Sequence, residues 1–238
     1  MSQFPSRNIG PVKAGPLQPQ GGAAPSVDWA RLLQAAKNAT ANSINQWAQQ
    51  AAFIDGRINA VNAFGGKIVS PVVLETEINS AMISAGGPQS ICGGVSSGLW
   101  MKFKEWYQGY QLGGVPWYPA FAAFPGPFAP PMPNVPSPLG IGASAGLSGL
   151  TANNLADGIR QRIGATGMGL NGAGQFVTDY AAWFSQKMTF WLASAMWLNV
   201  IGSGPIPSFA PPYVPVGPVA GGTFKGNPGC LSGARFMV

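Results

Sequence analysis

The chain has 238 residues, of which 8% are charged and none is histidine, and its formal net charge is +6 at pH 7. An ordinary soluble surface is about a quarter charged, so we expect other chains or lipid to cover much of this one. Without histidine the chain lacks the usual general base, the commonest metal ligand and every Ser-His or Cys-His nucleophile pair. We therefore predict that it is not an enzyme and holds no metal or cofactor.

Two long stretches, 106–156 and 188–224, contain no Lys, Arg, Asp or Glu. Such stretches predict surfaces buried against copies of the chain, other structural subunits or a membrane. The thirteen basic residues are scattered rather than clustered, and specific nucleic-acid binding is not expected because it needs a basic stripe.

Residues 1–25 carry five prolines and four glycines with little periodicity, which predicts an extended N-terminal arm of the kind that wraps a neighbouring subunit. They contain no apolar run of the length that a signal peptide needs. The next segment, 26–66, reads as an amphipathic helix that starts at a Ser26 N-cap. Ile58, Val61 and Phe64, spaced by three, extend that helix or form a turn.

The segment 70–139 predicts a helix from Pro71 to Gly86, a glycine-rich join and an aromatic helix from Ser96. A proline-aromatic run follows, which we expect to be extended and partly polyproline II. The segment 150–219 repeats this order, with an aromatic helix over 176–201 and a second proline-rich run. We interpret the repetition as an internal duplication that packs the two aromatic helices across a pseudo-twofold axis. The alternative is a chance resemblance of biased composition.

These patterns predict a mainly α, all-helical fold, with long Pro/Gly-rich segments between helices and a C-terminal tail at 220–238 that neighbours would order. The large aromatic residues are the candidates for the core and for assembly contacts: Trp29, Trp47, Trp100, Phe103, Trp106, Trp117, Phe121, Phe128, Trp183, Trp191, Trp197 and Phe209. Cys92 and Cys230 are either two buried thiols or a disulfide.

The sequence favours a non-enzymatic structural subunit of a large assembly, such as a virion or bacteriophage tail-like particle, located in the virion or in a cytoplasmic assembly. We expect its partners to be copies of itself, other structural subunits or both. The alternative is a membrane-associated or membrane-active protein that uses the aromatic helices 95–111 and 176–201. The apolar run 188–201 is shorter than the roughly twenty residues that cross a bilayer.

Overall fold

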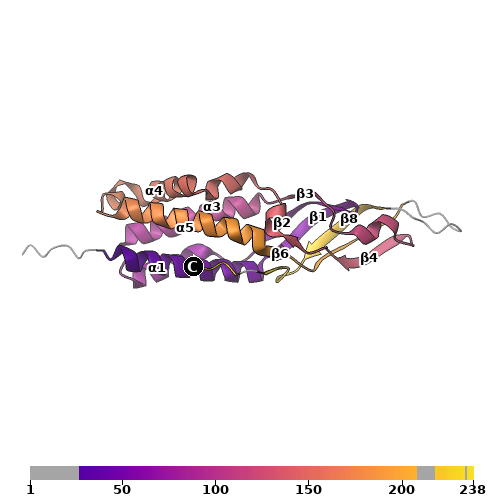
Figure 1. Ribbon diagram of the computed structural model, residues 1–238, viewed down its shortest axis with the longest axis horizontal. Coiled ribbons are helices and arrows are strands. Elements are labelled where there is room, and N and C mark those ends of the chain that lie inside the picture. Colours follow the sequence, from indigo (N-terminus) through magenta and orange to yellow (C-terminus); the bar gives the residue numbers. More distant parts are fainter. Residues whose placement is uncertain (1–26, 208–217, 234) are drawn as a thin grey trace, which may run out of the picture.

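The computed structural model describes residues 27–207, 218–233 and 235–238, so the predicted arm at 1–25 lies outside the described residues. The molecule is elongated, with a helical bundle at one end and β-structure at the other (Figure 1). Helices and strands alternate along the chain, so each half of the sequence contributes to both ends of the molecule.

Within the described residues, five α-helices form the bundle: α1 (Trp29–Gln50), α2 (Leu74–Ser84), α3 (Gln89–Gln108), α4 (Ala152–Met168) and α5 (Ala173–Ser194). The same part of the chain has three short 3-10 helices outside the bundle: η1 (Pro119–Ala123), η2 (Leu139–Ile141) and η3 (Ala145–Leu150). The N-cap of α1 is Asp28, whose Oδ1 accepts a hydrogen bond from the Arg31 amide at 3.0 Å. The aromatic helix α3 begins directly after Pro88, earlier than the Ser96 start that the sequence predicted.

Two glycines allow α3 and α4 to approach each other closely. A Cβ added at Gly94 would lie 2.7 Å from Ile163 Cα, and one at Gly98 would lie 2.9 Å from Ile159 Cα. Both distances are shorter than real Cβ contacts, so only glycine permits this packing. The GxxxG spacing of the two glycines places them one helical turn apart on the same face of α3.

The prediction of a mainly α, all-helical fold is wrong, because the structure is mixed α and β with two antiparallel sheets. The larger sheet has six strands in the order β3-β2-β1-β8-β7-β4, and the smaller has three in the order β5-β6-β9. The strands are β1 (Ala52–Ala60), β2 (Asn62–Val69), β3 (Leu112–Val115), β4 (Phe128–Pro133), β5 (Ser137–Pro138), β6 (Ala195–Trp197), β7 (Val200–Pro205), β8 (Val219–Gly226) and β9 (Leu231–Gly233).

The predicted helix over 26–66 ends at Gln50, and the rest of that segment forms the β1–β2 hairpin. The spacing of three from Ile58 to Phe64 was misleading, because Ile58 is buried whereas Phe64 is 38% exposed. Parts of the strands instead show the two-residue alternation of a half-buried sheet, with buried Gly56 and Ile58 on either side of exposed Arg57 in β1 and buried Gly66 and Ile68 on either side of exposed Lys67 in β2.

The proline-aromatic run is extended in part, as predicted, but it also pairs into sheets. Its β4 segment contains three prolines and lies at the edge of the larger sheet, where β7 is its one partner among the described strands. An edge strand tolerates prolines because its outward side needs no ladder hydrogen bonds.

The expected tail at 220–238 is also corrected, since β8 lies inside the larger sheet and β9 pairs with β6. Beyond β9, Phe236 is 2% exposed and packs against Trp183, Phe184 and Trp191 of α5. Asn45 of α1 fixes its backbone with two hydrogen bonds, of 2.9 and 3.0 Å. The C-terminal segment thus packs against the helical bundle of its own chain.

Both predicted repeat units, 70–139 and 150–219, contain two helices followed by strands, but the strands go to different places. The first unit supplies both edges of the larger sheet, β3 and β4, and β5 of the smaller sheet, whereas the second supplies β6 at the centre of the smaller sheet and β7 inside the larger one. Internal duplication stays a prediction. The closest backbone packing of α3 is against α4, not against the other aromatic helix, α5.

Candidate functional site

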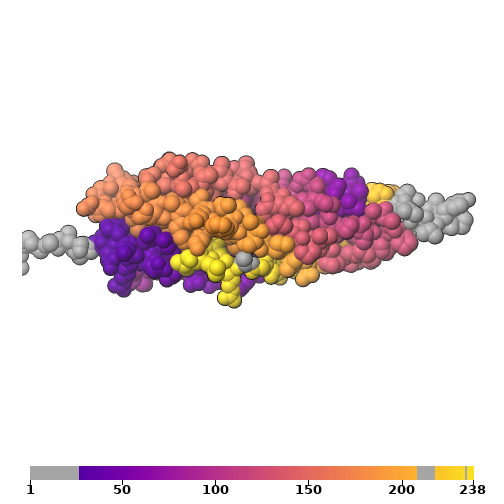
Figure 2. Space-filling model, in the orientation of Figure 1, coloured from indigo at the N-terminus to yellow at the C-terminus, as the bar shows by residue number. Residues whose placement is uncertain are grey.

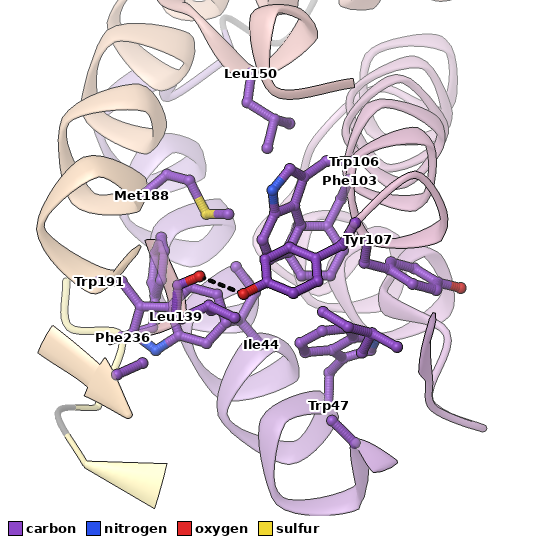
Figure 3. Packing of buried hydrophobic residues seen from close by; sticks show 14 of the residues in the cluster. Ile44, Trp47, Phe103, Trp106, Tyr107, Leu139, Leu150, Met188, Trp191 and Phe236 are labelled. Atoms are coloured by element: carbon purple, nitrogen blue, oxygen red, sulfur yellow. Dashed lines mark hydrogen bonds between the residues drawn. The ribbon is translucent and has the colours of Figure 1, made fainter. Parts of the chain in front are cut away.

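Most of the predicted aromatic residues form the core of the molecule. Four of them meet where α1, α3 and α5 converge, with Trp47 lying 5.0 Å from Phe103, 6.1 Å from Trp106 and 6.3 Å from Trp191 between ring centroids (Figure 3). Trp106 and Trp191 are themselves 6.2 Å apart. This cluster links the two aromatic helices through side chains.

A second aromatic group joins the bundle to the sheets. The Phe53 ring stacks on Trp197 with ring centroids 4.7 Å apart, and the Trp117 ring lies 6.1 Å from Phe53. Trp197 Nε1 donates to the Tyr110 hydroxyl at 2.9 Å, and that hydroxyl donates to Leu139 O at 2.7 Å, the bond drawn as a dashed line in Figure 3. A continuous polar chain therefore fixes η2 to the core.

The remaining predicted residues vary in exposure. Phe121 is buried and stacks on Tyr118, and Trp183 is nearly buried beside Phe236. Trp29 and Trp100 are half-buried, while Phe128 on the edge strand is 53% exposed. Phe209 lies outside the described residues.

The two cysteines are free and buried. Burial raises the pKa of both the Cys92 and the Cys230 thiol to about 11, which keeps them protonated and unreactive at neutral pH. Burial likewise raises the pKa of Tyr110 to about 12 and that of Tyr180 above its ordinary value. At neutral pH these buried groups are therefore uncharged.

The surface of the described residues has a mostly apolar groove of about 560 Å³. One wall is the outward side of α5, and the other is the segment 138–151 that contains η2 and η3. The lining residues are Pro138, Gly140, Ile141, Leu147, Leu150, Thr151, Ser185, Met188, Thr189, Leu192 and Ala193. None of them is charged, so the groove offers contacts to an apolar partner.

The groove is preformed, because the core holds its floor and walls. Met188 and Leu150 are 2% and 3% exposed and point toward Trp106 (Figure 3). A Cβ at Gly140 would lie 3.1 Å from Leu192 O, so η2 packs directly on α5 at one end of the groove. The Tyr110 bond to Leu139 O fixes the same wall.

The two uncharged stretches of the sequence meet at this groove. The stretch 106–156 supplies the wall from Pro138 to Thr151, and the stretch 188–224 supplies the α5 wall from Met188. The sequence analysis identified both stretches but not the groove residues, since it considered only large aromatic side chains. The lack of charge was the signal that could have found them.

Metal-ligand clusters and membrane-spanning helices are both absent from the part of the chain that the structure describes. No group of three or more His, Cys, Asp or Glu side chains there could hold a metal ion. Among the same residues, no helix has both the length and the apolar character to cross a bilayer. Comparisons with protein-family models, curated proteins and solved structures find no significant match.

Proposed function

We propose that this chain is a non-enzymatic structural subunit of a large protein assembly, of the kind that builds a virion or a phage-tail-like particle. The observation that carries the proposal is the uncharged groove, where two charge-free stretches far apart in sequence form one exposed surface. Continuous apolar surface of this kind marks a contact site on a soluble protein.

The surroundings of the groove support the same function. Phe190 is 64% exposed on α5, and Ile141 and Leu147 on the groove wall are 41% and 42% exposed. Figure 2 shows the orange surface of α5 in the middle of the visible face, open to a neighbour. The elongated shape presents a long side over which subunits can pack.

The membrane-associated alternative receives less support. It relied on the aromatic side chains of the helices 95–111 and 176–201, and most of these are directed into the bundle. Phe103, Trp106, Tyr180, Phe184 and Trp191 are each at most 2% exposed. They are already covered by protein and offer little surface to lipid.

A flotation experiment separates the two functions. The purified chain, without detergent, is mixed with liposomes and centrifuged through a density gradient. A structural subunit stays in the dense fractions as a multimer, whereas a membrane-associated protein floats with the lipid. Flotation with the liposomes would contradict the proposal.

Deleting residues 1–25 tests the arm separately. Loss of higher-order assembly with unchanged helical content by circular dichroism supports an arm that contacts neighbours. Unchanged assembly removes the arm from the proposal.

A further inference from the structure

The groove and Phe190 are complementary features of the same helix. Phe190 is the most exposed of the described aromatic side chains for which an exposure is given, and it lies within the α5 segment whose residues 185–193 line the groove. An exposed aromatic ring beside an uncharged hollow is an arrangement that a second copy can satisfy reciprocally. The groove favours an apolar occupant, because its lining is mostly apolar and carries no charge.

The helical geometry determines how two copies fit. Successive residues of an α-helix are about 100° apart around its axis, so Phe190 lies about 150° from the middle of the face formed by Met188, Thr189 and Leu192. Exposed Gln186 and Ala193 lie between them. The ring and the groove are thus on opposite flanks of the exposed strip of α5, at the same height along the helix.

A two-fold axis parallel to α5 exchanges these flanks while preserving height. It therefore places Phe190 of each copy over the groove of the other, whereas an axis perpendicular to α5 would oppose ring to ring and groove to groove. We propose that two copies of this chain pair side by side about an axis parallel to α5, with Phe190 of each in the other's groove. This inference rests on the proposed function and names the contact that starts assembly.

Charge and area fit such a pair. The strip between ring and groove is uncharged, so the net charge of +6 is kept away from the contact. The nearby Lys187 directs its Nζ to Val238 O at 3.2 Å. One aromatic ring buries about 150–250 Å², less than the roughly 800 Å² per partner of a stable interface. Phe190 is therefore the anchor of a larger contact made by α5 and the segment 138–151.

A charge-complementation experiment tests the pairing. Phe190→Lys and Leu147→Glu each replace an exposed side chain, so both variants should fold, which circular dichroism checks. Each variant alone places a charge in the apolar contact, and we expect its mass in sedimentation velocity to fall to half or less of the wild-type mass. In an equimolar mixture, one contact is a Lys–Glu pair and the other is the native ring in a native groove, so the wild-type mass should return.

Thr166→Lys and Leu170→Glu, exposed at the far end of the bundle, are the matched control charges and should leave the mass unchanged. Wild-type mass in both single variants, or no recovery in the mixture, would overturn the pairing and leave the structural function standing. Loss of mass with Leu147→Glu but not Phe190→Lys would show that the groove holds another occupant, such as residues 1–25, and would also overturn it. A wild-type chain that is monomeric at every concentration would overturn both proposals.

Discussion

Tyr110→Phe removes a single oxygen atom, yet we expect it to be strongly destabilising. The Tyr110 hydroxyl is buried, accepts from Trp197 Nε1 and donates to Leu139 O. Removing it leaves the indole N–H and the carbonyl without this partner, at about 1–3 kcal/mol for each buried group. The expected loss in the free energy of unfolding is therefore about 2–6 kcal/mol, a large part of the 5–15 kcal/mol typical of a folded domain.

Urea unfolding followed by tryptophan fluorescence measures this loss, and the midpoint should fall by roughly 1–2 M for a protein of this size. Tyr107→Phe is the matched control. Tyr107 packs against Trp47 in the same core, but its hydroxyl has no hydrogen-bond partner among the described residues. We expect the control to change stability by less than about 0.5 kcal/mol. Equal effects of the two substitutions would refute the role of the polar chain from Trp197 to η2.

Three further predictions concern the core. Gly98→Ala should destabilise the protein by roughly 1–3 kcal/mol because its Cβ would overlap Ile159. Gly93→Ala on the same helix has open space around it and should stabilise the protein by up to about 1 kcal/mol. Chemical denaturation measures both changes in the free energy of unfolding, and changes of the same sign would contradict the close packing of α3 on α4. Phe236→Ala should cost about 3–5 kcal/mol and expose the α5 core to 1-anilinonaphthalene-8-sulfonate, and an unchanged midpoint would mean that the C-terminal segment does not dock. Burial raises the folded-state pKa of Cys230 from 9.0 to about 11, so above pH 9 the unfolded state loses the thiol proton before the folded state does, and the free energy of unfolding should fall between about pH 9 and pH 11. Cys230→Ala should weaken this fall, and a variant with the wild-type pH profile would exclude the thiol as its cause.

The helices could be predicted where pattern and termini agreed. The apolar spacing from Leu32 to Trp47 is that of α1, and Gly86 and Gly87 end α2 as expected. Burial of most large aromatic side chains also follows from composition, because a chain this rich in Trp and Phe needs somewhere to bury them. Exceptions such as Phe128 depend on which edge of a sheet a residue occupies, and that is a tertiary property.

The sheets could not be predicted because their strands are short and their pairing is non-local. β1 pairs with β8 across more than half the chain, from Phe53 with Gly226 to Ala60 with Val219. Many strand positions are glycine or proline, which have low β-propensity and signal loops. The register comes from close approaches that only the folded molecule reveals, such as the Phe224 ring occupying the place of a side chain at Gly56.

The sequence predicted that a contact surface exists but not where the groove lies, because the groove also depends on non-local packing. Charge-free stretches indicate a contact surface, but their meeting point depends on the way η2 packs on α5, which rests on Gly140 and the Tyr110 hydrogen bond. Leu147 and Leu192 look like ordinary core residues in the sequence. Only the structure shows that they line a surface hollow.

The absolute mass of the purified chain in detergent-free buffer, by size-exclusion chromatography with light scattering, tests the account most directly. We expect a discrete even multiple of 24.6 kDa that persists on dilution to low micromolar concentration. A mass of 24.6 kDa at every concentration would contradict the claim that the uncharged surface is an assembly contact.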